Sequence, residues 1–375
     1  MRNILITGGA GFIGLNLTIK LISKGYNITI IDCLSPQIHD KAESSLFKRV
    51  KDKCRFIKGD VRVKADLQKA IKGQEIIIHL AAETGTGQSM YEKSKYYDVN
   101  VKGTENLLEL LAEKKYPVKK IIIASSRAIY GEGKYLCQNN DFVYPSLRSE
   151  EDMKQGDFNP KSNACTSQIK LVATDEKSKI HPTSIYGITK QKQEELILSV
   201  AKSLNIPAVS FRYQNVYGPG QSLSNPYTGI LSIFSTRILN NNNIYIYEDG
   251  LQSRDFVYIQ DVVDATILGI EEDSANGEVF NVGSGVPITV NDVAIFLKEM
   301  YHSNVSIIIN GKFRLGDIRH NYADLTKISN LLGFKPKYSF GQGISKFVEW
   351  VKTQEIKEDK YENSIIELIS KGVMK

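Results

Sequence analysis

The feature that most constrains the fold is a glycine-rich turn close to the start of the chain. An apolar run at residues 4–6 leads directly into Gly8-Gly9-Ala10-Gly11-Phe12-Ile13-Gly14, and an amphipathic stretch at residues 13–24 follows. In a strand, turn and helix of this kind, the glycines permit a tight turn, let the backbone approach a bound group closely, and allow the helix to pack on the strand. The sequence therefore predicts one β-α unit of a parallel sheet.

The same rhythm continues through the first half of the chain. Short runs rich in β-branched residues alternate with amphipathic helical patterns at residues such as 101–114 and 184–204. This alternation predicts an α/β fold, a Rossmann-type doubly wound parallel sheet with a smaller C-terminal α/β substrate lobe. The expected buried strands are residues 4–6, 28–31, 55–57, 76–78, 121–123 and 208–211.

The glycine turn in this context is typical of a site for the pyrophosphate of a dinucleotide, because a helix N-terminus offers free N–H groups and a positive dipole. Asp32 ends the second expected strand, where a carboxylate accepts hydrogen bonds from the adenosine ribose and repels a 2′-phosphate. We therefore expect NAD rather than NADP. A turn without a ligand, and an Asp32 that only caps a loop, are the structural alternatives. The expected cofactor contacts are Gly8, Gly11, Phe12, Ile13, Gly14, Asp32, Asp60, Val61, Ala81 and Ala82, with Tyr186 and Lys190.

The length of 375 residues exceeds the size at which one core usually stops growing. We expect an NAD-binding Rossmann domain over residues 1–212 and a mainly substrate-binding lobe over residues 213–352, with some segments that return to the first domain. Residues 353–375 are expected to form a helical tail. A polar stretch at about residues 132–182 interrupts the periodicity, and we interpret it as an insertion over the active-site side.

Composition excludes several classes of protein. No apolar run approaches the roughly twenty residues that span a bilayer, and the net charge of +6 is spread along the chain rather than gathered in one patch. The cysteines, Cys33, Cys54, Cys137 and Cys165, show no Cys-x-x-Cys spacing. We therefore expect a cytoplasmic protein with reduced thiols, no bound metal, and neither a membrane nor a nucleic-acid partner.

Tyr186 and Lys190 stand four residues apart at the start of a helical pattern, so their side chains share one face. A lysine ammonium close to a phenol favours the phenolate, which makes the tyrosine a general base for a hydroxyl proton. Ser126 follows an expected strand at the carboxyl edge of the sheet, where its hydroxyl could join substrate and tyrosine. Each residue also has a structural interpretation. Tyr186 and Lys190 could simply be neighbours on a helix surface, and Ser126 could end the strand through a hydrogen bond from its side chain to the backbone.

Together these motifs resemble the extended short-chain dehydrogenases/reductases of the nucleotide-sugar epimerase/dehydratase family. The resemblance implies that Ser126, Tyr186 and Lys190 form a catalytic triad. It also implies that Ser126, Asn215, Arg254 and Arg319 contact a nucleotide-sugar substrate, the arginines through its diphosphate. The segments that carry the resemblance are Thr7 to Gly14, Asp32, Ser125-Ser126, Tyr186-x-x-x-Lys190 and Asn215 to Gly220.

The residues after Ser126 help to choose a reaction. The 4,6-dehydratases of this family carry an Asp-Glu pair there, and this chain has Arg127 and Ala128. Without those proton-transfer groups, epimerisation or simple oxidoreduction is favoured. Three segments are similar to 4-epimerases of the family: residues 34–37, 82–89 and 224–229.

We therefore expect an NAD-dependent nucleotide-sugar 4-epimerase that acts by transient C4 oxidation and hydride return, on a dTDP-6-deoxyhexose or a UDP-hexose. A nucleotide-sugar reductase or decarboxylase on the same fold is the enzymatic alternative. A non-catalytic NAD-binding scaffold is the alternative of another class. The resemblance also implies a homodimer that pairs through residues 101–114 and 184–204.

Overall fold

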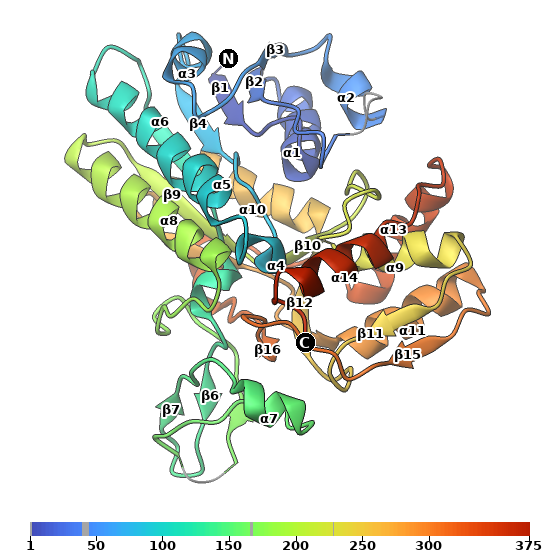
Figure 1. Cartoon of the computed structure of the whole chain (residues 1–375). Helices are drawn as coiled ribbons and strands as arrows, with labels where there is room; N and C mark the ends of the chain where they lie inside the picture. The colour runs from blue at the N-terminus through green and yellow to red at the C-terminus, as the bar shows by residue number, and fades with distance from the viewer. Residues whose placement is uncertain (1, 40–44, 166–167, 228) are drawn as a thin grey trace.

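A parallel sheet forms the centre of the first lobe (Figure 1). The computed structural model describes residues 2–39, 45–165, 168–227 and 229–375. The sheet has seven strands in the order β13-β9-β5-β4-β1-β2-β3, and all neighbouring pairs are parallel. Its strands are β1 (Asn3–Thr7), β2 (Asn27–Asp32), β3 (Arg55–Lys58), β4 (Ile76–His79), β5 (Lys120–Ser126), β9 (Ala208–Tyr213) and β13 (Val279–Val282).

Alternate side chains of each strand enter two separate cores. Ile4 and Ile6 pack in one core with residues of α1 and α10, whereas Leu5 packs in the other with residues of α3, α6 and α8. Because both faces are covered, the strands are apolar throughout rather than alternating. The predicted doubly wound α/β fold is therefore confirmed.

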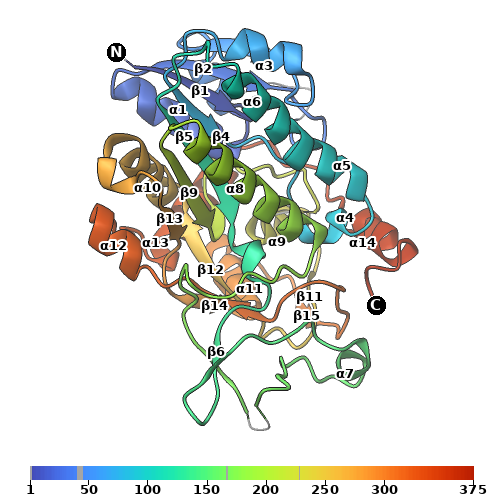
Figure 2. The ribbon, with the colours of Figure 1, turned by 90° about the vertical axis from the view of Figure 1, so that its left-hand side faces the viewer.

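The helices form layers on both faces of the sheet, and Figure 2 shows α6 and α8 side by side over one of them. A π-helical turn, η1, joins α5 to α6. No helix in the described ranges is long and apolar enough to cross a bilayer. The helices of this lobe are α1 (Phe12–Ser23), α2 (Ser45–Val50), α3 (Lys64–Ala70), α4 (Thr86–Ser89), α5 (Lys93–Tyr97), η1 (Asp98–Lys102), α6 (Gly103–Ala112), the 3₁₀ turn η2 (Arg127–Tyr130), α8 (Ile185–Ser203) and α10 (Ile259–Glu271).

The second lobe is smaller and built on short strands. One group contains β10 (Asn215–Tyr217), β12 (Ser253–Tyr258), β14 (Pro287–Thr289) and β16 (His320–Asn321), and a separate parallel pair contains β11 (Ile244–Ile246) and β15 (Ile307–Ile309). The chain returns to the large sheet through β13, which pairs with β9. The remaining helices are α9 (Ile230–Leu239), the 3₁₀ turn η3 (Asp273–Ala275), α11 (Val290–Tyr301), α12 (Thr326–Leu332), α13 (Phe340–Lys352) and α14 (Tyr361–Ser370).

The polar insertion forms a small subdomain that projects away from the sheet (Figure 1). It contains β6 (Tyr135–Leu136), β7 (Phe142–Val143), α7 (Glu150–Lys154) and β8 (Lys170–Leu171). None of its described residues lines the large cavity between the lobes, and its position over the active-site side stays a prediction. The buried Arg148 guanidinium instead ties it to the second lobe through Glu248, at 2.9 Å, and pairs with Glu132 at 3.1 Å.

The expectation of reduced thiols is wrong for two cysteines. Cys137 and Cys165 form a disulfide, with their Cα atoms 6.1 Å apart. The pair is not visible in the sequence because 28 residues separate its members, and the folding of the insertion brings them together. Cys33 and Cys54 are free thiols. The described residues contain no group of three or more His, Cys, Asp or Glu that could hold a metal ion.

Removing the disulfide is predicted to loosen the insertion. A cross-link that closes a loop of 28 residues typically contributes about 2–4 kcal/mol by restricting the open chain. The double variant Cys137→Ser/Cys165→Ser should therefore be cut faster by protease within residues 137–165, as followed by mass spectrometry of the fragments. Cys54→Ser, which removes a free thiol, is the matched control. Equal cleavage rates in both variants would contradict a structural role for the disulfide.

Candidate active site

The glycine turn between β1 and α1 packs so closely against neighbouring backbone that there is no room for a side chain at Gly8 or Gly14. Gly8 has φ +67°, and a Cβ there would lie 2.8 Å from Cα of Ala81. A Cβ on Gly14 would lie 2.6 Å from Cα of Gly9. Gly11 is the N-cap of α1 without a side-chain cap, and the first helical turn contains no acidic residue. This cradle suits a pyrophosphate, since the helix N-terminus favours an anion.

Asp32 lies at the carboxyl end of β2 and lines the cavity. Its Oδ2 atom accepts a hydrogen bond from the backbone N–H of Ala10 at 3.0 Å, and Oδ1 accepts one from the N–H of Leu34 at 2.9 Å. These bonds fix the carboxylate beside the glycine turn. Asp32 therefore caps the loop and also presents acceptor oxygens where the adenosine ribose of a dinucleotide is expected.

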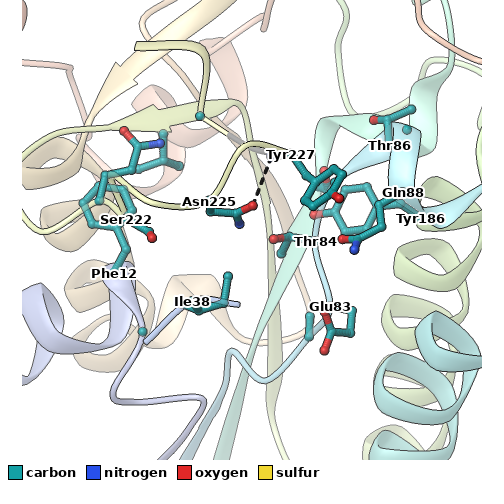
Figure 3. A pocket seen from close by; sticks show the side chains of 18 of the residues that line it. Phe12, Ile38, Glu83, Thr84, Thr86, Gln88, Tyr186, Ser222, Asn225 and Tyr227 are labelled. Carbon is teal, nitrogen blue, oxygen red and sulfur yellow. Dashed lines mark hydrogen bonds between the residues drawn. The ribbon is translucent and has the colours of Figure 1, made fainter. Parts of the chain in front are cut away.

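One cavity of about 880 Å³ runs between the lobes, which is the size range of small-molecule and cofactor sites. All twelve residues that the sequence predicts for the cofactor line it. Figure 3 shows Phe12 and Ser222 on one side, and Tyr186 and Gln88 on the other. The twelve are Gly8, Gly11, Phe12, Ile13, Gly14, Asp32, Asp60, Val61, Ala81, Ala82, Tyr186 and Lys190.

The Ser126 hydroxyl lies within hydrogen-bonding reach of the Tyr186 phenol. Ser126 ends β5, and Tyr186 begins the first turn of α8. The two elements come together because α8 starts with a glycine at the contact: a Cβ on Gly187 would lie 2.6 Å from the carbonyl oxygen of Ala128. The Ser184 side chain caps this helix by accepting a hydrogen bond from the N–H of Gly187 at 3.1 Å.

Burial raises the pKa of Tyr186, and the Ser126 hydrogen bond and the Arg127 guanidinium oppose that rise. Burial lowers the pKa of Lys190 to about 7. The Arg127 guanidinium is thus a cation near the Tyr186 phenol that favours the phenolate.

A buried polar network holds Lys190 in place. The Lys190 ammonium donates a hydrogen bond to Oε1 of Gln193 at 2.7 Å, and Nε2 of Gln193 donates to the Thr104 hydroxyl at 3.0 Å. His79 contacts the same hydroxyl through Nε2 at 3.0 Å. Burial, with a smaller contribution from Lys190, lowers the pKa of His79 to about 3. The imidazole is therefore neutral and serves as a hydrogen-bonding support for the lysine.

Arg127 belongs to the site, although in the sequence it stood out only because it takes the place of a carboxylate found in the dehydratases. It lines the cavity directly after Ser126, and its Nε donates a hydrogen bond to Oδ1 of Asn215 at 3.2 Å. Burial and then the nearby Arg254 lower the pKa of Arg127 to about 9. Two neighbouring, partly buried cations make this part of the cavity suited to an anionic ligand. The signal available in the sequence was the position of Arg127 beside the catalytic serine.

Of the predicted substrate contacts, Ser126, Asn215 and Arg254 line the cavity. Arg254 donates hydrogen bonds to the backbone carbonyls of Ile318, at 2.6 Å, and Arg319, at 2.9 Å. Burial lowers its pKa.

Arg319 is not on the cavity wall. Its guanidinium binds both carboxylate oxygens of Asp249 at 2.6 Å and Glu248 at 3.0 Å, so the structure gives it a structural role instead of the predicted diphosphate contact.

Arg314 occupies the cavity wall in its place. It lies five residues earlier in the same predicted segment, and its Nε donates a hydrogen bond to Oδ2 of Asp317 at 2.8 Å. Arg314 precedes the Gly316-Asp317 pair and Arg319 follows it. The sequence alone does not show which of the two arginines faces the cavity. The described lining residues include four arginines, Arg62, Arg127, Arg254 and Arg314.

Comparison with known proteins identifies the family. Residues 4–283 match the family model described as the NAD-dependent epimerase/dehydratase family. The chain belongs to this family. It is 37% identical to a dTDP-L-rhamnose 4-epimerase of Burkholderia thailandensis, over 93% of this chain and 95% of that protein.

Solved structures support the same assignment. A UDP-glucose 4-epimerase from Thermotoga maritima, solved with UDP-glucose, superposes with a TM-score of 0.76 and 31% identity, over 94% of this chain and 99% of that one. A UDP-glucuronic acid 4-epimerase from Bacillus cereus, in complex with UDP-glucuronic acid and NAD, gives a TM-score of 0.77 and 26% identity over the same shares. The chain is therefore an enzyme, and its cofactor is NAD, for which the glycine cradle and Asp32 provide fitting contacts.

Replacing Arg127 is predicted to change the pH dependence of the reaction. Arg127→Met removes the cation that favours the Tyr186 phenolate, so the rising limb of the kcat profile should move to higher pH, with about a tenfold loss at neutral pH for each pH unit of displacement. Arg127→Lys keeps a positive charge and should fall between the parent and Arg127→Met. A pH–rate profile for Arg127→Met that coincides with that of the parent would contradict this role.

Proposed function

We propose that this chain is an NAD-dependent nucleotide-sugar 4-epimerase. The observation that carries the proposal is the environment of Tyr186. Its phenol lies against Ser126 and near Arg127. The two residues after Ser126 are Arg127 and Ala128, so the positions that carry an acid and a base in the dehydratases of this family hold no carboxylate here.

The side chains divide the reaction among them. Tyr186 accepts the proton of the sugar C4 hydroxyl, and Ser126 donates a hydrogen bond that orients the phenol and the sugar oxygen. Arg127 stabilises the phenolate. Lys190, fixed by Gln193, lies one helical turn from Tyr186 and supports the position of the nicotinamide ribose.

Bound NAD supplies the acceptor, and later the donor, of the C4 hydride. The chain contributes binding energy at the diphosphate, through Arg254 and Arg314, so the nucleotide stays anchored while the 4-keto sugar turns within the cavity. Once turned, the keto sugar presents its opposite face to the hydride donor, so return of the hydride would invert the configuration at C4 and regenerate the cofactor. Tyr186 returns its proton to the C4 oxygen.

Two alternatives make different predictions. A reductase or decarboxylase on this fold would change the amount of NADH during turnover or release CO₂, whereas an epimerase does neither. A scaffold protein would have no use for Ser126, Tyr186 and Lys190 at one end of a cavity. The presence of all three there supports an enzyme.

We infer a dTDP-6-deoxyhexose or a UDP-hexose as substrate. The support is the 37% identity to the dTDP-L-rhamnose 4-epimerase and the overall similarity to the UDP-glucose 4-epimerase. The deciding experiment is mass spectrometry and NMR of the products formed from a panel of dTDP-, UDP-, GDP- and CDP-sugars. An epimer formed without net NADH supports the proposal, and the absence of an epimer from every sugar in the panel contradicts it.

We further propose a homodimer in the cytoplasm. The support for the dimer is that α6 and α8 lie side by side on one face of the sheet (Figure 2), as a contact formed by four helices would require. Sedimentation of the purified protein at micromolar concentration tests this assembly. The compartment stays a prediction from the sequence alone.

Tyr186→Phe is predicted to abolish turnover without unfolding the protein. The ring and its packing remain, but the hydroxyl that accepts the sugar proton is gone, so kcat should fall about a hundred- to ten-thousandfold. NAD content and melting temperature should stay close to those of the parent. Tyr26→Phe, directly before β2 and at the amino-terminal edge of the sheet, is the matched control. Near-normal turnover of Tyr186→Phe would remove the role assigned to this residue.

In the parent, deuterium at C4 of the substrate should remain at C4 of the epimer, because one bound cofactor removes and returns the same hydride. NMR of the product measures its position. Loss of the label to solvent would instead indicate removal of a proton from carbon.

Arg314→Ala and Arg319→Ala are predicted to have different effects. Arg314 faces the cavity, so its loss should raise KM for the nucleotide sugar about ten- to a hundredfold, by removing a charge-assisted contact. Loss of Arg319 leaves the buried Glu248 with one cation fewer and should lower the free energy of unfolding by about 3 kcal/mol. Kinetics and thermal unfolding of both variants test this, and a larger KM effect for Arg319→Ala would favour the original sequence prediction.

A further inference from the structure

The C-terminal segment, Tyr361–Lys375, closes one side of the cavity. It lies beyond the part of the chain that matches the family model, which ends at residue 283. Figure 1 shows α14 between α4 and α9, across the front of the space between the lobes. One face of the helix contributes to the cavity wall through Tyr361, Ser364, Ile365 and Leu368.

Backbone hydrogen bonds fasten the end of this segment to the residues around Arg314. The N–H of Phe313 donates to the carbonyl of Lys375 at 3.0 Å, and the N–H of Lys375 donates back at 2.9 Å. The N–H of Leu315 donates to the carbonyl of Val373 at 2.9 Å. Residues 373–375 thus pair in antiparallel fashion with the residues on either side of Arg314, whose side chain lines the cavity.

A second set of contacts fixes the start of the segment. The Arg237 guanidinium lies over the ring of Tyr361 at 4.2 Å and over that of Tyr245 at 5.1 Å. It also pairs with Asp359 at 3.3 Å and Glu362 at 3.1 Å, while its side chain is only 3% exposed. A buried arginine held by two rings and two carboxylates gives α14 a defined position rather than a loose contact.

Neighbouring contacts place this wall beyond the diphosphate arginines as seen from the catalytic tyrosine. Arg127 comes directly after Ser126, and Arg254 donates a hydrogen bond to the carbonyl of Ile318 at 2.6 Å, next to Asp317, which accepts one from Arg314 at 2.8 Å. Arg314 lies next, over the ring of Tyr247 at 5.4 Å, and the Tyr361 hydroxyl donates a hydrogen bond to that of Tyr247 at 3.0 Å. A nucleotide sugar with its C4 hydroxyl at Tyr186 and its diphosphate at the arginines therefore has its nucleoside at this wall.

We propose that Tyr361–Lys375 forms one wall of the nucleoside subsite, with Ile365 and Leu368 in contact with the base and the terminal residues holding Arg314 at the diphosphate. The inference rests on the proposed function, because it assumes a nucleoside diphosphate in the cavity. Apolar and aromatic side chains are suited to a base, whose flat faces gain from dispersion and from exclusion of water.

The helix itself offers a matched pair of variants. Ile365 faces the cavity and is 8% exposed, whereas the adjacent Ile366 is 65% exposed. Ile365→Ala and Ile366→Ala remove the same atoms from the same helix. We would titrate NAD-loaded protein with UDP and with dTDP, which lack the sugar, and measure Kd by calorimetry.

Ile365→Ala should raise Kd for the preferred nucleoside diphosphate about fifteen- to sixtyfold, as expected for the loss of two or three buried carbon contacts. KM for the nucleotide sugar should rise in parallel, with a smaller change in kcat. Ile366→Ala should match the parent in both measurements. Should Ile365→Ala lose NAD or melt early, Ile365→Val removes only one carbon and should raise Kd about fourfold.

Two outcomes separate this inference from the proposal on which it rests. Binding of a nucleoside diphosphate by the parent, with unchanged Kd in Ile365→Ala and Ile365→Val, would overturn the role of the C-terminal segment and leave the epimerase proposal standing. Failure of the parent to bind either nucleoside diphosphate would overturn this inference together with the proposed UDP- or dTDP-sugar substrate, and the panel of sugars would then decide the epimerase proposal by itself.

Discussion

The close contact between the start of α8 and the turn η2 is the constraint on which the active site depends. The backbone at Gly187 approaches the carbonyl of Ala128 so closely that a Cβ would lie 2.6 Å from its oxygen. Because η2 continues directly from β5, this contact brings Ser126 at the edge of the sheet against Tyr186 on the helix. A side chain at residue 187 would push the helix away, and the serine and tyrosine would no longer act on one hydroxyl group.

Buried and partly buried cations give the cavity its electrostatic character. Burial lowers the pKa of Lys190, Arg127 and Arg254, and the pKa of Arg127 falls further because Arg254 is close. Each of these groups is held in a less favourable environment than water provides, and an anionic ligand would relieve that cost. Substrate binding and the stability of the folded protein should therefore be linked, since a ligand that binds only the folded state stabilises it.

The two segments outside the common fold differ in their relation to this cavity. The insertion is closed by its own disulfide and anchored through Arg148, and its described residues do not reach the cavity wall. The C-terminal segment does reach it, through α14 and the strand-like pairing around Arg314. Polarity and length drew attention to the insertion in the sequence, yet the shorter tail contributes directly to the site. Only contacts between distant segments distinguish the two cases.

The sequence by itself determined the doubly wound sheet, the glycine turn and the positions of Ser126, Tyr186 and Lys190, because each depends on local periodicity or on spacing within one element. Tertiary structure decided which charges act together. Arg127 is close enough to favour the Tyr186 phenolate, and Arg314 rather than Arg319 faces the cavity. The Cys137–Cys165 disulfide was likewise hidden. The physical reason is common to all three: electrostatic and covalent partners are set by distance in space, which no sequence spacing specifies.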